Sequence, residues 1–387
     1  MNCDIYKEEL ARLKESGMLR QIPQIEGQSK WIEIEGEQLL NLSSNDYLGL
    51  FERYDLKVEF YAQFQGKLPH LSSASSRLLT GNNRASEELE TLLAEMYGKE
   101  SALIFNSGYH VNSGLLAALS HQGSFIIADK LVHASIIDGI KLSGSPFARY
   151  SHNDMVHLER ILQKEYDSYS QIFITTEGVF SMGGDKGKIT ELVELKKRYP
   201  NVVLYVDEAH SFGVCGENGL GVCEELGLLN EVDIIIGTFG KAISSVGAYA
   251  VMSKVVREYL VNKMRPLIFS TSLPPLNIEW SRFVISRIAG FKAEREQLHQ
   301  LSQLLRERLN VKDSESQIIG YTVGEASRAV ALSKELMKRG FYALPVRPPT
   351  VPKGQSGVRF SLTAAVTKEE IERLCSTIKE ILERENI

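Results

Sequence analysis

A lysine and an aspartate each follow a short apolar run, and both are residue types that can do chemistry on a bound group. The run VVLYV precedes Asp207, His210 follows three residues later, and the run DIIIGTFG precedes Lys241. A lysine beside apolar walls loses part of its preference for the charged form, so its amine can join an aldehyde as a Schiff base. Taken alone, Asp207 can also be a carboxylate that caps the next turn, and Lys241 an exposed strand-end lysine.

Asp207 and Lys241 together match the needs of pyridoxal phosphate (PLP). An amine holds the aldehyde of this cofactor, and a carboxylate keeps its pyridine nitrogen protonated, which makes the ring an electron sink. The phosphate needs a cradle of its own. The segment 106–110 (NSGYH) lies between an apolar run and a helical run, so the backbone N–H groups of Gly108 and Tyr109 are expected to face an anion at a helix N-terminus.

The letters DEAH at 207–210 also match the Walker-B-like acid of a helicase. That alternative requires a P-loop of the form G-x-x-x-x-G-K-[ST]. Lys188 and Lys241 follow Gly187 and Gly240, but neither has the upstream glycine or the following Ser or Thr. Nucleotide binding is therefore not expected.

Two further polar side chains also follow apolar runs. His133 follows one run in ADKLVHAS, and Ser181 follows another in TEGVFSMGGD. An imidazole can stack on a cofactor ring, although a histidine at this place can equally be only a neighbour of a helix N-cap. Because the carboxyl ends of parallel strands meet at one edge of a sheet, we expect His133 and Ser181 to converge there with Lys241 and Asp207.

The apolar runs that precede these residues predict buried strands. They recur at 102–105, 125–128, 172–175, 202–206, 234–236 and 248–252, mostly separated by segments long enough for a helix. Runs that are apolar at every position fit strands that are buried on both faces. The sequence therefore predicts an α/β fold, with a mostly parallel sheet covered by helices on both faces.

Changes in sequence texture divide the 387 residues into three expected parts. Residues 1–49 form an amphipathic N-terminal helix and the start of an irregular, turn-rich arm that continues to about Gly81. Residues 50–280 form a large α/β domain, in which 86–96 is helical. Residues 281–387 are charged and rich in helical patterns around the stretch SGVRFSLTA, and they form a smaller C-terminal α+β domain.

The composition excludes several classes of protein. With 44 basic and 49 acidic residues the chain has a net charge of −5, and no basic block indicates a nucleic-acid surface. No stretch approaches the apolar length of a membrane span, and the N-terminus lacks the apolar core of a signal peptide, so a cytoplasmic location is expected.

The cysteines predict neither disulfides nor a metal site. Cys3, Cys215, Cys223 and Cys375 lack CxxC spacing and the density of a disulfide framework. They form no zinc pattern with the eight scattered histidines. We therefore expect four reduced thiols.

Eight motifs, spread over nearly the whole chain, resemble the α-oxoamine synthases, which are PLP enzymes of fold type I. They are LSSNDYLGL, IFNSGYHVN, DKLVHAS, TEGVFSMGGD, VDEAHSFGVCGENGLG, GTFGKA, IFSTSLPP and RPPTVPKG. The resemblance implies an acyltransferase that condenses an amino acid with an acyl thioester and releases CO2.

The resemblance also assigns a role to each matching residue. Lys241 would hold PLP as a Schiff base and transfer protons, Asp207 would pair with the pyridine nitrogen, and His133 would stack on the ring. His210 and Ser181 would lie near the phenolic oxygen. The remaining residues are implied to bind the phosphate (Ser107, Gly108, Tyr109, Thr238 and, from the other subunit of a homodimer, Thr271) and the substrate (Arg20, His133, Arg347, Thr350 and Arg359, of which Arg359 would pair with the amino-acid carboxylate).

Within the family, the ending VRPPTVP at 346–352 resembles the biotin-pathway branch. This branch implies L-alanine and a pimeloyl thioester, carried by CoA or by an acyl carrier protein, as substrates. Glycine with acetyl-CoA or succinyl-CoA is the nearest alternative. A non-catalytic partner subunit of the same fold is an alternative of another class, but it would have no chemical need for Lys241, Asp207 and both histidines.

One segment departs from the family pattern. Family members often carry a glycine-rich loop where this chain has LSSASSR at 71–77, with no glycine until Gly81. This difference lies on the acyl-donor side of the expected site. The choice of acyl donor is therefore left open by the sequence.

Overall fold

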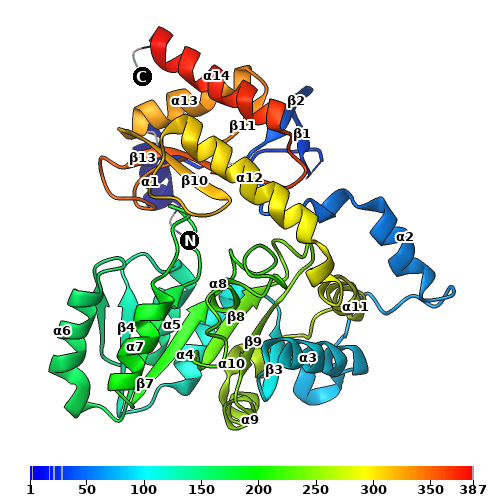
Figure 1. The fold of residues 1–387 in the computed structure, drawn as a ribbon, viewed down its shortest axis with the longest axis vertical. Coiled ribbons are helices and arrows are strands. Elements are labelled where there is room, and N and C mark those ends of the chain that lie inside the picture. Colours follow the sequence, from blue (N-terminus) through cyan, green and yellow to red (C-terminus); the bar gives the residue numbers. More distant parts are fainter. Residues whose placement is uncertain (2, 17, 21, 28, 386–387) are drawn as a thin grey trace.

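The computed structural model describes residues 1, 3–16, 18–20, 22–27 and 29–385. A large sheet surrounded by helices lies at one end of the molecule, and smaller sheets with the C-terminal helices lie at the other (Figure 1). We call these two parts the large domain and the small domain.

The large sheet has seven strands in the order β3-β9-β8-β7-β6-β4-β5. Strand β9 runs antiparallel to both of its neighbours, and the other pairs of neighbouring strands are parallel. The strands are β3 (Ser101–Phe105), β4 (Ser124–Asp129), β5 (Phe147–Tyr150), β6 (Gln171–Glu177), β7 (Val202–Asp207), β8 (Ile234–Thr238) and β9 (Ala248–Met252). The predicted mostly parallel sheet is confirmed.

These strands are apolar at nearly every position because both faces of the sheet are covered. Along β3, Ala102 and Ile104 belong to one apolar cluster, whereas Leu103 and Phe105 belong to a second cluster on the opposite face. The helices α3 (Arg84–Tyr97), α6 (Met155–Glu165) and α7 (Ile189–Arg198) supply side chains to the first cluster, and α4 (Gly108–Leu119), α5 (Ala134–Ser143) and α9 (Lys254–Lys263) supply the second.

The small domain combines the C-terminal part of the chain with strands from the N-terminal arm. An antiparallel sheet has the order β10-β13-β12, and β2 pairs with β1 and, in parallel, with β11. Strands from the two ends of the sequence therefore lie side by side, beside the C-terminal helices (Figure 1). The elements are β1 (Trp31–Ile34), β2 (Glu37–Asn41), β10 (Ile318–Gly324), β11 (Phe341–Tyr342), β12 (Leu344–Val346), β13 (Ser356–Ser361), α12 (Lys292–Leu309), α13 (Ala326–Lys338) and α14 (Lys368–Glu385).

The arm between residues 22 and 81 is not irregular throughout, so that prediction was wrong. It contains the hairpin of β1 and β2 and the helix α2 (Tyr54–Ala62). The hairpin turns through Glu35 and Gly36, whose φ angles are 54° and 82°. Strands of four and five residues show too few alternations to stand out beside such turn residues.

Short elements complete the described chain. The helix predicted at 86–96 begins at Arg84, because Asn83 caps it by accepting a hydrogen bond from the N–H of Ser86.

All four cysteines carry free thiols. Across the described ranges, no helix combines the length and the apolar character needed to cross a membrane. The remaining helical segments are α1 (Asp4–Glu15), η1 (Leu50–Glu52), η2 (Arg77–Gly81), η3 (Tyr166–Ser168), α8 (Val222–Glu225), α10 (Arg265–Ile268), α11 (Pro275–Ile285) and η4 (Ile288–Gly290).

Candidate active site

The carboxyl ends of the central strands place the predicted residues along one edge of the large sheet. Glu177 at the end of β6 pairs with Asp207 at the end of β7, and β7 pairs with β8, which ends at Thr238. Strand β9 lies between Thr238 and Phe105, the last residue of β3. The loops after these strands therefore start at the edge where open parallel sheets bind ligands.

Lys241 lies in the loop after β8 and is partly buried. Its Nζ is 2.9 Å from Nε2 of His210. Burial lowers the pKa of Lys241 to about 8, although the negative charges of Asp207 and Glu177 oppose this shift. A minor but appreciable share of the side chain is then a free amine near neutral pH, which is the form that acts as a nucleophile or base.

Asp207 is buried, and hydrogen bonds hold both oxygens of its carboxylate. The N–H of Ala209 donates to Oδ1 at 2.9 Å, and Nδ2 of Asn112 donates to Oδ2 at 2.7 Å. Asn112 is oriented in turn by Tyr205, whose hydroxyl donates to Oδ1 of Asn112 at 2.6 Å. Sequence reasoning gave Asn112 no role, although it lies in the quoted motif IFNSGYHVN.

His133 caps α5 and lies close enough to Asp207 for their charges to interact. Its Nδ1 is 2.7 Å from Oγ of Ser135, and its backbone N–H donates to Oε1 of Glu177 at 2.5 Å. Burial lowers the pKa of His133, so the neutral ring is favoured, while Asp207 opposes this effect. Burial also raises the pKa of Glu177 well above its usual range, and the neighbouring Asp207 adds to that shift.

His210 is buried and contacts both domains. Nδ1 is 2.6 Å from the hydroxyl of Tyr47 in the arm, and the backbone carbonyl accepts a hydrogen bond from Nε2 of Gln317 at 2.7 Å. Burial lowers the pKa of His210 well below its usual range, and the positive charges of Lys241 and Arg359 add to this shift. A neutral imidazole therefore faces the amine of Lys241.

Arg359 on β13 connects the small domain to the loop after β6. Its Nε donates to the carbonyl oxygen of Ser181 at 2.6 Å. Both residues and His133 line one cavity of about 840 Å³. Apolar side chains form much of the wall, among them Val132, Phe180, Met182, Val346, Val351 and Val358.

Two of the other predicted substrate contacts line the same cavity. Nη2 of Arg20 is 3.5 Å from Oγ1 of Thr350, and both residues belong to the wall. Arg347 lies in the loop that carries Thr350, and the N–H of Thr350 donates to the carbonyl of Arg347 at 3.0 Å. Arg347 is not part of the wall of the cavity. The structure thus brings Arg20 and Thr350 to the cavity and leaves Arg347 beside it.

The predicted phosphate cradle lies at the first turn of α4. Ser107 caps this helix, and its Oγ accepts a hydrogen bond from the N–H of His110 at 3.2 Å. The space beside Gly108 is open, since a Cβ there would meet no atom within 4 Å. Tyr109 is exposed, and its hydroxyl donates to Asp138. The open helix N-terminus is suited to an anion.

Thr238 and Thr271 make hydrogen bonds to the loops around the sheet edge, and only Thr271 contacts a residue beside the cradle. The hydroxyl of Thr238 donates to the carbonyl of Gly247 at 3.0 Å and accepts from the N–H of Gly240 at 3.2 Å. The carbonyl of Thr271 accepts a hydrogen bond from Nδ2 of Asn106 at 2.8 Å. The role of Thr271 across a subunit interface stays a prediction.

The glycine-poor loop at 71–77 makes its turn through side-chain contacts. Ala74 has a φ of 50°, in the left-handed region that glycine enters without steric cost. Its N–H donates to Oγ of Ser72 at 3.0 Å, and Arg77 forms an ion pair with Glu90. The loop thus contains a left-handed residue without using glycine there.

His152 joins two of the loops that carry the site. Its Nδ1 is 2.9 Å from Asp129 at the end of β4, and its Nε2 is 2.6 Å from Asp185 in the loop after β6. Burial opposes the charged form, but the hydrogen bonds to both carboxylates outweigh it and raise the pKa of His152 to about 9. The first loop leads to His133 and the second contains Ser181, so this bridge fixes their separation.

We expect His152→Gln to destabilise the protein at about pH 6 and to have little effect at about pH 10. The pKa is raised from 6.5 to about 9 on folding, so the stabilisation is complete below the lower value and disappears as the pH rises through the higher one. The full shift would correspond to about 3 kcal/mol, and because the side chain of His152 is 27% exposed, solvent screening reduces the expected loss to about 1–2 kcal/mol. Thermal unfolding midpoints across this pH range provide the measurement. His157→Gln is the control, since His157 is a partly buried histidine whose Nδ1 accepts a hydrogen bond from the N–H of Ser151 at 3.1 Å, and an equal loss at every pH would contradict the charge argument.

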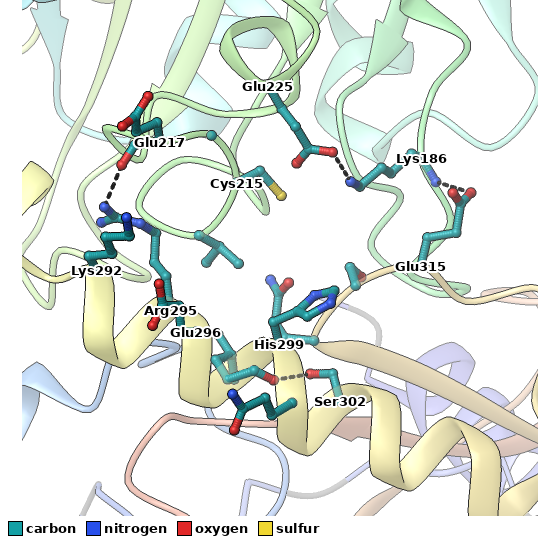
Figure 2. A pocket seen from close by; sticks show the side chains of 16 residues that line it. Lys186, Cys215, Glu217, Glu225, Lys292, Arg295, Glu296, His299, Ser302 and Glu315 are labelled. Carbon is teal, nitrogen blue, oxygen red and sulfur yellow. Dashed lines mark hydrogen bonds and ion pairs between the residues drawn. The ribbon is translucent and has the colours of Figure 1, made fainter.

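A second cavity, of about 390 Å³, lies between the large domain and α12 (Figure 2). Lys186 pairs there with Glu225 at 2.5 Å, and Arg295 donates to the carbonyl of Glu217 at 2.7 Å. None of the predicted catalytic residues is in its wall. Gln317 lines this cavity and contacts the backbone of His210, so the cavity lies behind the candidate site.

Comparison with known proteins agrees with this arrangement. The family model described as "Aminotransferase class I and II" matches residues 37–378. A protein of Pasteurella multocida (strain Pm70), named "Putative 8-amino-7-oxononanoate synthase", is 50% identical over 383 residues, which cover 98% of this chain and 99% of that protein.

Two solved structures of named enzymes have the same fold. A serine palmitoyltransferase from S. paucimobilis with bound PLP and myriocin has a TM-score of 0.90 at 26% identity, covering 98% of this chain and 97% of that one. The 8-amino-7-oxononanoate synthase from Francisella tularensis has a TM-score of 0.75 at 29% identity, covering 90% and 99%. The predicted fold type I architecture is thereby confirmed.

Proposed function

This chain belongs to the family of class I and II aminotransferases and is an enzyme of the 8-amino-7-oxononanoate synthase type, and on this premise we propose that it condenses L-alanine with a pimeloyl thioester. The products would be 8-amino-7-oxononanoate, CO2 and the free thiol of CoA or of a carrier protein, as a step of biotin synthesis. The observation that carries the proposal is the partly neutral amine of Lys241, which lies beside His210 and Asp207.

The residues at the sheet edge fit PLP by their chemistry. Asp207 would pair with the pyridine nitrogen, His133 would face the ring, and Lys241 would hold the aldehyde carbon. When bound, PLP supplies an electron sink for the negative charge that develops on the amino acid. The remaining contacts are assigned to the phenolic oxygen (His210 and Ser181) and to the phosphate (Ser107, Gly108, Tyr109, Thr238 and, from a second subunit, Thr271).

Lys241 is the group that moves protons in this proposal. As a free amine it removes the proton from Cα of alanine, and as an ammonium group it returns one. A base works best when its pKa lies near the working pH, and the pKa of Lys241 is lowered by burial to about 8. Asp207 and Glu177 limit this shift, so the amine can still be reprotonated.

Arg359 would hold the carboxylate of alanine. Its Nε is engaged by the carbonyl of Ser181, which orients the guanidinium group in the cavity. A planar guanidinium group can bind a carboxylate through two parallel hydrogen bonds. The amino acid would thereby be placed with its Cα toward Lys241.

The condensation changes bonds at Cα of alanine and at the carbonyl carbon of the thioester. A C–C bond forms between Cα of alanine and the thioester carbonyl carbon, and the C–S bond breaks to release the thiol. The bond between Cα and the carboxylate then breaks and releases CO2, after which a proton restores Cα. The apolar wall of the cavity, which includes Val346 and Val351, suits the methylene chain of the acyl group.

Serine with a long acyl thioester is the second candidate reaction. The specific observation in its favour is the higher TM-score of the serine palmitoyltransferase structure. The sequence identity of 50% to the Pasteurella protein favours alanine and pimeloyl substrates.

Thiol release from defined substrate pairs tests the proposal. Purified, PLP-loaded protein is given alanine, glycine or serine with pimeloyl-, acetyl-, succinyl- or palmitoyl-CoA, and alanine with pimeloyl carrier protein. We expect release to be fastest with alanine and a pimeloyl thioester. Preference for glycine with a short acyl chain, or for serine with palmitoyl-CoA, would contradict the proposed substrates, and silence with every pair would contradict the proposed reaction.

A further inference from the structure

A chain of hydrogen bonds links the N-terminal arm to the amine of Lys241 through His210. The hydroxyl of Tyr47 is 2.6 Å from Nδ1 of His210, and Nε2 of the same ring is 2.9 Å from Nζ of Lys241. The ring planes of Tyr47 and His210 are tilted by 50° with centroids 6.1 Å apart, so the contact is a hydrogen bond and not a stack. Both nitrogens of His210 are therefore engaged.

The main chain of Tyr47 is held by the small domain. The N–H of Ala364 donates to the carbonyl of Tyr47 at 2.8 Å, and Oγ of Ser361 donates to the carbonyl of Ser44 at 2.6 Å. The side chain of Tyr47 has no exposed surface, at 0%. Its hydroxyl thus has a fixed position relative to the imidazole of His210.

Both rings are neutral in this setting, which limits the ways in which protons can be shared. Burial raises the pKa of Tyr47, and burial with the charges of Lys241 and Arg359 lowers the pKa of His210. The phenol has one proton and the imidazole has one, so each contact has a single donor.

Two arrangements satisfy the contact between Tyr47 and His210. In the first, Tyr47 donates to Nδ1, and Nε2–H faces Lys241, whose nitrogen can accept only as a free amine. In the second, Nδ1–H donates to the hydroxyl of Tyr47, which then donates to Oδ1 of Asn45 at 3.1 Å. The contact with His210 is the shorter of the two, which favours His210 as the acceptor of the phenol proton.

We propose that Tyr47 is a positioning residue that donates to Nδ1 of His210 and thereby holds this histidine as the Nε2–H tautomer. The proposal rests on the proposed function in one respect, because the group held at Lys241 would present a phenolic oxygen, which accepts hydrogen bonds. His210 must then offer a donor at Nε2, and its Nδ1 is left with a lone pair. Tyr47 supplies the donor that this lone pair needs.

The ring nitrogens of His210 report the tautomer directly by nuclear magnetic resonance. Protonated and unprotonated ring nitrogens resonate far apart, and the signals of His210 are identified by their loss in His210→Gln. We expect the full-length chain, labelled with ¹⁵N-histidine and loaded with PLP, to show a protonated Nε2 and an unprotonated Nδ1. Protonation at Nδ1 in this spectrum would overturn the proposal, and this result needs no variant of Tyr47.

Two substitutions test which group accepts the phenol proton of Tyr47. Tyr47→Phe removes the phenol proton, so the proton of His210 is expected to redistribute between the two nitrogens. Asn45→Ala removes the competing acceptor and is expected to leave the His210 signals unchanged. Tyr97→Phe is the matched control, since Tyr97 is a buried phenol that donates to the carbonyl of Leu220 at 2.8 Å. Unchanged His210 signals in Tyr47→Phe, or altered ones in Asn45→Ala, would refute the assignment.

Kinetics supply a readout that a purely structural role would not move. For Tyr47→Phe we expect kcat to fall about fivefold to tenfold, the effect of one neutral hydrogen bond, with little change in KM for the amino acid. An equal fall in Tyr97→Phe would mean that the loss is structural and would contradict the proposal. If every substrate pair is silent, the proposed function fails while the tautomer measurement still decides the role of Tyr47.

Discussion

Replacing Lys241 with alanine is expected to lower turnover by about 10⁴-fold or more, because the proposed general base and the proposed anchor of the cofactor would be lost together. The amine of Lys241 is the only one that lies within hydrogen-bond distance of His210 in the described residues. No neighbouring side chain can take over both tasks. Release of thiol and of CO2 from alanine and a pimeloyl thioester measures the loss.

The lost activity of Lys241→Ala would not arise from unfolding. Burial lowers the pKa of Lys241 from 10.5 to about 8, so the charged lysine costs stability in the folded state. We therefore expect the variant to have an unfolding temperature at least as high as that of the parent protein. A large drop in that temperature would contradict this explanation.

Lys188→Ala is the matched control for Lys241→Ala. Lys188 also follows a glycine in the large domain, but its side chain is exposed and it caps α7 without a side-chain hydrogen bond. Its loss is expected to leave the rate within about twofold, as for most exposed positions. Borohydride reduction of the PLP-loaded proteins, followed by peptide mass spectrometry, should place the cofactor on Lys241 in Lys188→Ala. Appreciable turnover in Lys241→Ala would exclude its assigned role.

The convergence of strand-end residues could be predicted from the sequence because it depends on a local pattern. Runs such as VVLYV at 202–206 are apolar at each position, which indicates strands buried on both faces, and most strands of this kind are parallel, as β7 is to β6 and β8. Once the strands are parallel, the residues after them share an edge. Asp207 and Lys241 could therefore be brought together before any contact was known.

The residues that orient this site could not be found in the same way. Asn112 contacts Asp207 across 95 positions, and Tyr47 contacts His210 across 163. Such contacts depend on how α4 and the arm pack on the sheet, which no local period encodes. The only available signal was that both residues lie within motifs quoted for the family resemblance.

Asp207→Asn is expected to lower kcat by about 10²–10³-fold while PLP is largely retained, because the ring loses the charge that keeps its nitrogen protonated. The amide is nearly isosteric, but only one oxygen remains for the two donors, Ala209 N–H and Asn112 Nδ2. The charge of Asp207 raises the pKa of Lys241, so its removal lowers that pKa and increases the share of free amine. A shortage of base therefore cannot explain the lower rate.

Asp233→Asn is the control for Asp207→Asn, because it removes one negative charge from the large domain at a position away from the candidate site. Asp233 precedes β8 at the opposite end of the strand, where it pairs with Lys196 at 2.7 Å, so its neutralisation is expected to leave kcat nearly unchanged. Rates, PLP content by absorbance and unfolding temperatures are measured for both variants. If Asp207→Asn loses PLP and activity to the same extent, Asp207 acts in cofactor retention and not in the chemistry. If it keeps PLP and loses the rate, the carboxylate acts through the protonated ring, since the free amine of Lys241 is then more abundant.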